Sequence, residues 1–298
     1  MNGILCVNKP EGFTSFDVIA KLRGIMKIKR IGHGGTLDPM ATGVLPVFVG
    51  TATKACDIIP DTSKAYRAGF RLGISTDTLD ITGEITAEYS SKVTEKDILD
   101  VIPKFTGNIK QIPPMYSAIK IGGQKLCNLA RKGIEIERPE REITVDSIKL
   151  ESFDEDLQSG VISVICSKGT YIRSLIDDIG KSLGCGGVMT SLVRTWSGGF
   201  SLSDCFTLEE IQKYADLGNI EEKVLISVES AFSGLPKLRL NEVQTRMYRN
   251  GVKLDLNRIN HIKENVCEYA VYGYDHEFIG IACADFKKFE LRVVKNFI

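Results

Sequence analysis

The segment from Gly32 to Val47 constrains the fold of this chain more than any other stretch. It reads Gly-His-Gly-Gly-Thr-Leu-Asp-Pro-Met-Ala-Thr-Gly-Val-Leu-Pro-Val, with no helical spacing of its apolar residues. Glycine and proline at this density specify tight turns, because glycine tolerates unusual backbone angles and proline fixes φ. We therefore expect a rigid turn that presents one carboxylate, Asp38. The alternative is that Asp38 only caps its own turn through bonds to nearby backbone groups.

Four further blocks accompany this segment along the chain. They are Lys-Pro-Glu-Gly-Phe-Thr-Ser at 9–15, Lys-Ala-Tyr-Arg at 64–67 with Thr-Asp-Thr-Leu-Asp at 76–80, Cys-Ser-Lys-Gly-Thr-Tyr-Ile-Arg-Ser-Leu at 166–175, and Leu-Val-Arg-Thr at 192–195. Together and in this order, the five blocks resemble the motifs of the TruB family of tRNA pseudouridine synthases. Agreement at five separated places is far less expected by chance than agreement at one.

The resemblance implies a reaction and a substrate. It implies isomerisation of uridine to pseudouridine at position 55, in the T-loop of tRNA, after the target base has been flipped out of its stack. An enzyme of this kind is an isomerase that needs a carboxylate nucleophile and no redox partner or energy source. The nucleophile attacks either C6 of uracil or C1′ of ribose, and the sequence does not choose between them.

The same resemblance assigns catalytic roles to three residues. Asp38 would be the nucleophile, and Arg173 would keep its carboxylate charged, since an adjacent cation lowers a carboxylate pKa. Tyr66 would stack on the flipped base and assist proton removal from C5. The structural alternatives are a local helix pair between Arg173 and Asp177 and plain strand packing for Tyr66.

A second set of residues is expected to bind the RNA. His33 would enter the RNA where the base leaves, and Leu192 would wall the uracil pocket. Lys9 and Asp80 match family positions near the site, and Lys9 would orient the opening loop. The segment 110–143 resembles the RNA-gripping thumb of the family, with a cysteine at position 127 where a tyrosine is usual. The substrate-binding residues predicted in all are His33, Lys9, Asp80, Leu192, Lys120, Lys125 and Arg131.

No cofactor or metal is expected. The chain has three histidines, and none stands at metal-ligand spacing from another candidate ligand. Residues 180–182 resemble the end of a phosphate-binding loop, but they close a helix where such a loop must open one. The eight cysteines are scattered without a paired motif, so we expect reduced and mostly buried thiols.

The fold class expected is α+β, with two domains. The resemblance implies a catalytic domain over 1–233, which carries a mixed, mainly antiparallel sheet with flanking helices and the thumb at 110–143. A small PUA-like RNA-binding domain would follow at 234–298. Apolar patterning predicts strands at 3–8, 65–72, 85–89, 161–166, 268–274, 278–284 and 291–294. Capping motifs and apolar spacing predict helices that start at Thr14, Thr94 and Thr207, one over 171–183, a short one over 126–131 inside the thumb, and one over 241–250.

A net charge of zero does not exclude a polyanionic partner, because the basic residues are unevenly distributed. The chain has 38 basic and 38 acidic side chains, but basic residues are concentrated in 21–33 and 110–143. We expect the tRNA T-arm as partner, no membrane, no obligatory protein partner, a monomer and a cytoplasmic location. A second hypothesis is a non-catalytic RNA-binding or RNA-folding protein that grips the same loop.

Overall fold

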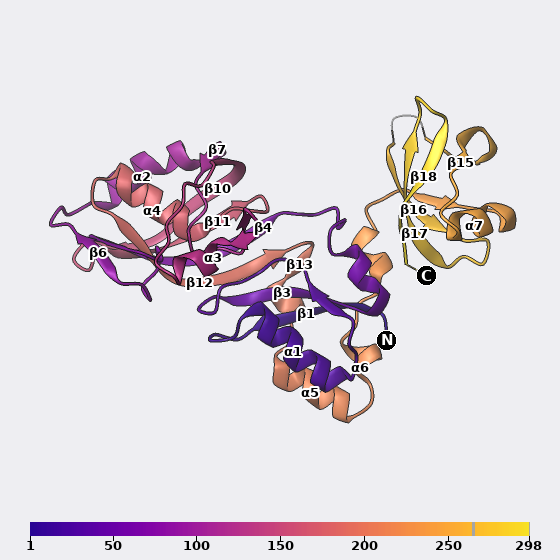
Figure 1. Ribbon diagram of the computed structural model, residues 1–298, viewed down its shortest axis with the longest axis horizontal. Helices are drawn as coiled ribbons and strands as arrows, with labels where there is room; N and C mark the ends of the chain where they lie inside the picture. Colours follow the sequence, from indigo (N-terminus) through magenta and orange to yellow (C-terminus); the bar gives the residue numbers. More distant parts are fainter. Residues whose placement is uncertain (264–265, 298) are drawn as a thin grey trace. The chain divides into compact units, whose positions relative to one another are not determined.

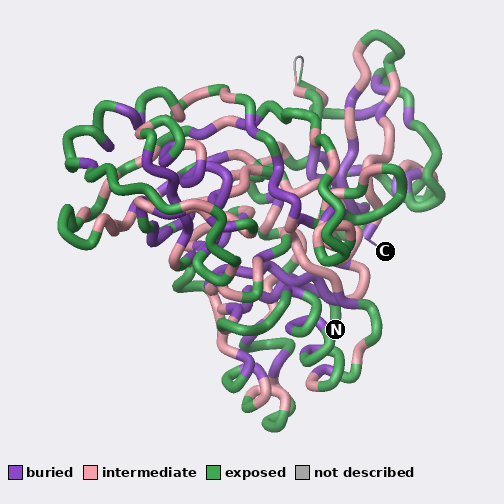
Figure 2. The backbone as a smooth tube through the Cα atoms, turned by 60° about the vertical axis from the view of Figure 1, so that its left-hand side comes forward, coloured by how far each residue is buried: buried purple, intermediate pink, exposed green. Residues whose placement is uncertain are grey.

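The structure is a computed structural model that describes residues 1–263 and 266–297, and its chain divides into two compact units. The first unit combines residues 1–38 and 45–61 with the described part of 198–298, and the second combines 39–44 with 62–197. The course of the chain through the elements is drawn in Figure 1. Figure 2 marks the buried course of the central strands in purple and the exposed loops in green.

A mixed, mainly antiparallel sheet forms the centre of the second unit. Its strands run in the order β12, β4, β11, β10 and β7, and the start of β3 adds a parallel pairing with β12. The bounds are β7 Gly107–Gln111, β4 Lys64–Leu72, β11 Ser159–Cys166, β10 Arg141–Asp154, β12 Gly187–Ser197 and β3 Thr42–Val49. This arrangement confirms the predicted sheet.

Two helices cover one face of that sheet. Even-numbered residues of β4 such as Phe70 are buried, whereas Arg67 and Arg71 are exposed, which is the period-two pattern of a strand with one covered face. Side chains from α2 (Glu95–Val101), the 3-10 turn η2 (Ile102–Phe105) and α4 (Ile172–Ser182) meet Phe70 in one apolar cluster. A short hairpin, β5 (Ile74–Thr76) with β6 (Ile85–Glu88), follows β4.

The first unit has two separate hydrophobic cores. In one, β1 (Gly3–Lys9), β2 (Ile31–His33) and the end of β3 pack with α1 (Ser15–Met26), α5 (Leu208–Asp216) and α6 (Ile220–Lys223). In the other, a five-stranded sheet packs with α7. Its elements are β14 Lys237–Arg239, α7 Glu242–Arg249, β15 Leu254–Asp255, β16 Glu268–Tyr272, β17 Phe278–Asp285 and β18 Glu290–Asn296. The helix predicted over 241–250 and the strands predicted at 268–274, 278–284 and 291–294 are therefore confirmed.

The predicted helix starts are also confirmed, because their signals are local. Thr14, Thr94 and Thr207 each accept a hydrogen bond from the backbone of the residue three positions later, whose side chain returns a bond. This reciprocal pair satisfies two backbone donors at the helix end. Phe16, although apolar, is 64% exposed on α1 and lies beside Arg23 instead of in the core.

Other expectations need correction. Strand β12 was missed because two bulges, after Met189 and after Arg194, break its alternation. The thumb is shorter than 110–143, since Gln111 pairs with Arg141 inside the sheet, and the excursion is 112–140. It contains α3 (Leu126–Ala130) and the small hairpin of β8 (Lys120–Ile121) with β9 (Gln124–Lys125).

The eight cysteines are free thiols, as expected, but only Cys6, Cys166 and Cys185 are buried. Among the described residues, no helix has the length and apolar character needed to cross a membrane.

Candidate active site

The loop that carries Asp38 joins β2 to β3 and is held from both sides. His33 at the end of β2 pairs with Val47, and the Gly34 amide donates to the Pro46 carbonyl over 2.8 Å. On the other side, the Ser15 hydroxyl accepts from the Leu37 amide at 2.8 Å and donates to the Leu37 carbonyl at 3.2 Å. Because Leu37 is buried and fixed at two atoms, the neighbouring Asp38 is presented from a constrained backbone.

A glycine fixes the chain just after this loop. Gly43 has φ +100°, and a Cβ atom there would lie 2.2 Å from the Arg194 carbonyl oxygen. Arg194 is fully buried, and its Nε donates to the Val44 carbonyl over 2.7 Å. Only glycine meets both the backbone angle and the close approach of β12.

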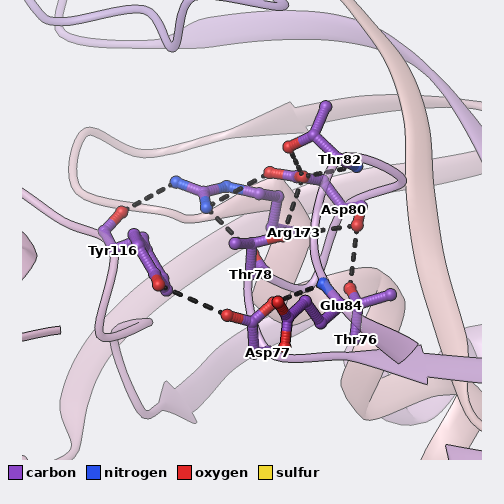
Figure 3. Close-up of polar contacts among 8 residues, drawn as sticks. All are labelled: Thr76, Asp77, Thr78, Asp80, Thr82, Glu84, Tyr116 and Arg173. Carbon is purple, nitrogen blue, oxygen red and sulfur yellow. Dashed lines mark hydrogen bonds and ion pairs between the residues drawn. The ribbon is translucent and has the colours of Figure 1, made fainter. Parts of the chain in front are cut away.

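Arg173 lies in the first turn of α4, and three residues from two segments hold its guanidinium (Figure 3). Nη1 donates to the Thr78 carbonyl at 2.9 Å and reaches Asp80 Oδ2 at 3.4 Å, while Nη2 donates to the Tyr116 carbonyl at 2.9 Å. The side chain is only about 5% exposed. A buried guanidinium needs such acceptors, since removing it from water is costly.

Asp80 is equally buried, and hydrogen bonds hold its carboxylate in place beside this cation. Its Oδ1 accepts three hydrogen bonds: from Thr78 Oγ1 at 2.8 Å, Thr82 Oγ1 at 2.6 Å and the Thr82 amide at 3.1 Å. Its backbone pairs with Met189 of β12. The local alternative, in which Arg173 pairs with Asp177, is replaced by a different arrangement: Asp177 binds Lys181 at 2.7 Å.

Tyr66 and Leu192 share one face of the sheet. Tyr66 lies opposite Arg194, and Leu192 lies opposite Ala68, in the antiparallel pairing of β4 and β12. Directly opposed residues point to the same face, and so do residues two apart in one strand. Tyr66 and Leu192 are each 7% exposed on this face.

A lysine with a low pKa stands two residues from Tyr66. Burial and the nearby Arg194 cation lower the pKa of the Lys64 ammonium to about 8. By the same period-two rule, Lys64 and Tyr66 lie on one face of β4. Lys64 therefore gives up its proton more readily than an exposed lysine does.

Lys9 orients the opening loop. Its side chain is fully buried, and Nζ donates to the carbonyls of Pro10 at 2.8 Å and Phe13 at 2.5 Å. These bonds fold the loop onto the end of β1.

The three basic thumb residues gather at one concavity. Lys120, Lys125 and Arg131 line a hollow of about 580 Å³ together with Lys132 and Asn128. The hollow is rich in cations and amides, which are groups that bind phosphates and base edges.

A second cleft, of about 630 Å³, lies between the thumb and α4, and its lining includes Asp77, Tyr116 and Ser174. Asp178 also lines it, and burial, reinforced by the Asp177 charge, raises the pKa of Asp178 to about 6. In the described part of the chain, no group of His, Cys, Asp or Glu side chains could hold a metal ion.

The predicted site residues thus fall into the two units. The first carries Lys9, His33 and Asp38, and the second carries the remaining predicted residues. Sequence patterns missed the groups that hold Arg173 and Asp80, although Thr78 lies within a quoted motif and Thr82 follows it closely.

Comparisons with known proteins identify the family. Residues 23–172 match the model of the TruB family pseudouridylate synthase N-terminal domain, and 173–233 match that of the tRNA pseudouridylate synthase B C-terminal domain. Proteins named tRNA pseudouridine synthase B are similar over nearly the whole chain. The one from Clostridium kluyveri is 44% identical and covers 100% of both chains, and that from Clostridium tetani is 46% identical over 94% of this chain and 95% of its own.

Solved structures show the same fold. A chain in the crystal structure of a Cbf5-Nop10-Gar1 complex matches with TM-score 0.74 and 27% identity, over 99% of this chain and 85% of its own. A chain in an H/ACA RNP bound to a substrate RNA containing 2′-deoxyuridine matches with TM-score 0.73 and 26% identity, with the same coverages. This chain belongs to the TruB family of pseudouridylate synthases.

Proposed function

We propose that this protein isomerises uridine 55 of the tRNA T-loop to pseudouridine, with Asp38 as nucleophile. The enzyme class follows from the family, and the tRNA substrate is supported by the names of the similar proteins from two Clostridium species. The observation that carries the role of Asp38 is its loop, which Ser15 and Pro46 hold on either side. The opposite hypothesis, a non-catalytic RNA-binding protein, finds no support among these relatives.

The reaction requires a dry, preorganised site. Asp38 would attack the flipped nucleotide, Arg173 would stabilise the charged carboxylate, and Tyr66 would stack on the uracil and assist loss of the C5 proton. Leu192 would wall the base pocket from the same sheet face as Tyr66. His33 would occupy the space that the flipped base leaves in the RNA.

RNA affinity would come from outside this pocket. The thumb hollow formed by Lys120, Lys125 and Arg131 would grip phosphates of the T-arm. We further propose that 1–233 acts as the catalytic domain and 234–298 as a PUA-like RNA-binding domain. The protein would work in the cytoplasm, as a monomer and without an obligatory protein partner.

The test is release of tritium from C5 of uridine. A T-arm stem-loop labelled only at position 55 is incubated with wild-type protein, Asp38→Asn or Asp57→Asn, without added cofactor; Asp57 is an exposed carboxylate and serves as the control. We expect release by the wild type and by Asp57→Asn but not by Asp38→Asn. Tight RNA binding without tritium release by the wild type would refute the proposed enzymatic activity. Tritium release by Asp38→Asn at the wild-type rate would refute the role of Asp38 as nucleophile.

A further inference from the structure

Gln111, the last residue of β7, is bonded to the residue from which α4 starts and leads into the thumb stalk, residues 112–116. Gln111 is 3% exposed, and both polar atoms of its side chain are used. Its Nε2 donates to the Tyr171 carbonyl at 3.0 Å, and its Oε1 accepts from the Tyr171 amide at 2.8 Å. Tyr171 is the N-cap of α4 and makes no capping bond with its own side chain. The amide of Gln111 therefore fixes the backbone two residues before Arg173.

Two more bonds join the stalk to the same helical turn. The Ser174 hydroxyl donates to the Ile112 carbonyl at 3.2 Å, and Arg173 Nη2 donates to the Tyr116 carbonyl at 2.9 Å. The Tyr116 hydroxyl in turn donates to Asp77 Oδ2 at 3.3 Å, on the loop that bears Asp80 (Figure 3). The stalk thus contacts α4 at consecutive places and also supplies one acceptor of the guanidinium.

The stalk continues directly into the basic end of the thumb. The Ser117 carbonyl accepts from the Cys127 amide at 3.1 Å, and the Ile119 carbonyl accepts from the Leu126 amide at 2.8 Å. These bonds close the small hairpin that carries Lys120. One continuous segment of the chain therefore includes Tyr116, which accepts a hydrogen bond from Arg173, and Lys120, which is predicted to bind RNA.

We propose that Gln111 is a positioning residue for the isomerisation, which fixes the first turn of α4 against the thumb stalk and so sets where the Arg173 guanidinium lies. The inference rests on the proposed function, because it takes Arg173 as the partner of the nucleophile. The acceptors of Arg173 come from separate segments, so its place is defined only while these segments keep their mutual arrangement. Displacement of a catalytic group by about 1 Å costs on the order of 100-fold in rate.

The test separates chemistry from binding. Gln111→Met keeps the side-chain volume and removes both bonds to Tyr171. With enzyme in excess over the labelled stem-loop, we expect its single-turnover rate constant to fall about 10- to 100-fold. The dissociation constant should change by less than about threefold, since no predicted RNA contact is altered. Gln212→Met, in a surface bond on α5, is the matched control and should leave both quantities unchanged.

A second variant covers the case in which Gln111→Met does not fold. Ser174→Ala removes only the bond to Ile112, and it should lower the same rate constant by about three- to tenfold with unchanged affinity. A wild-type rate in a folded Gln111→Met protein, or a loss of affinity alone in either variant, would overturn the proposal. An inactive wild type would instead refute the proposed function, so the two failures are distinguishable.

Discussion

Replacement of Asp80 by asparagine tests the buried pair that holds Arg173. Asparagine keeps the shape, and its Oδ1 can still accept the three bonds from Thr78 and Thr82. Its amide group, however, places a donor opposite Arg173 Nη1, where Asp80 Oδ2 stood at 3.4 Å. The buried guanidinium then loses the negative charge of Asp80.

The expected cost follows from the geometry. Removal of one partner from a buried ion pair costs about 3–5 kcal/mol. The pair here is longer than the roughly 2.7–2.9 Å of a strong charge-assisted bond. Arg173 also keeps the carbonyl acceptors of Thr78 and Tyr116. We therefore expect a loss of about 2–3 kcal/mol, which corresponds to a melting temperature lower by roughly 4–12 °C.

The assay is thermal unfolding followed by circular dichroism, with Asp77→Asn as control. Asp77 is exposed and three residues away, and it accepts one bond from the Glu84 amide and one from the Tyr116 hydroxyl. Asparagine can still accept the Glu84 bond through Oδ1 and can donate from Nδ2 to the Tyr116 hydroxyl oxygen, so this control should lose less than about 0.5 kcal/mol. Equal melting temperatures for the two variants would show that the Asp80 charge does not stabilise Arg173.

Three further predictions concern other parts of the chain. Gly43→Ala should lower the free energy of unfolding by about 3 kcal/mol or abolish soluble expression, because its Cβ would overlap a backbone oxygen of β12. Gly12→Ala, at φ +81° in open space, should lower it by only about 1 kcal/mol, and equal melting temperatures of the two variants would contradict the prediction. Asp178→Asn should stabilise the protein above pH 6 by about 1 kcal/mol after allowance for solvent screening. The reason is that the raised pKa of Asp178 makes the wild-type protein lose stability as the pH rises from about 4 to 6. Urea unfolding midpoints of both proteins at pH 4 and 7 check this, and a difference that does not depend on pH would exclude it. Alanine at Lys120 and Lys125 should weaken T-arm binding and lower the slope of log K against log salt by about 1.5, in filter-binding titrations; an unchanged slope would remove the thumb from the RNA contact.

The elements that could be predicted from sequence are those whose signals are local. The capping pairs that start α1, α2 and α5 lie within four residues, and β4 shows its covered face by simple alternation. Strand β12 was missed because its bulges shift the register, and a bulge depends on the partner strand. The family blocks identified Asp38, Tyr66 and Arg173 as the residues to examine.

The sequence by itself thus determined the family and where most helices start, since motifs and capping pairs depend on residue type and short spacing. Only the tertiary structure decided what holds Arg173: its acceptors at Thr78 and Tyr116 are 95 and 57 positions away along the chain. No periodicity relates such positions. Burial forces the guanidinium to find acceptors, and the fold of the sheet, the loop after β5 and the thumb stalk determines which ones it meets.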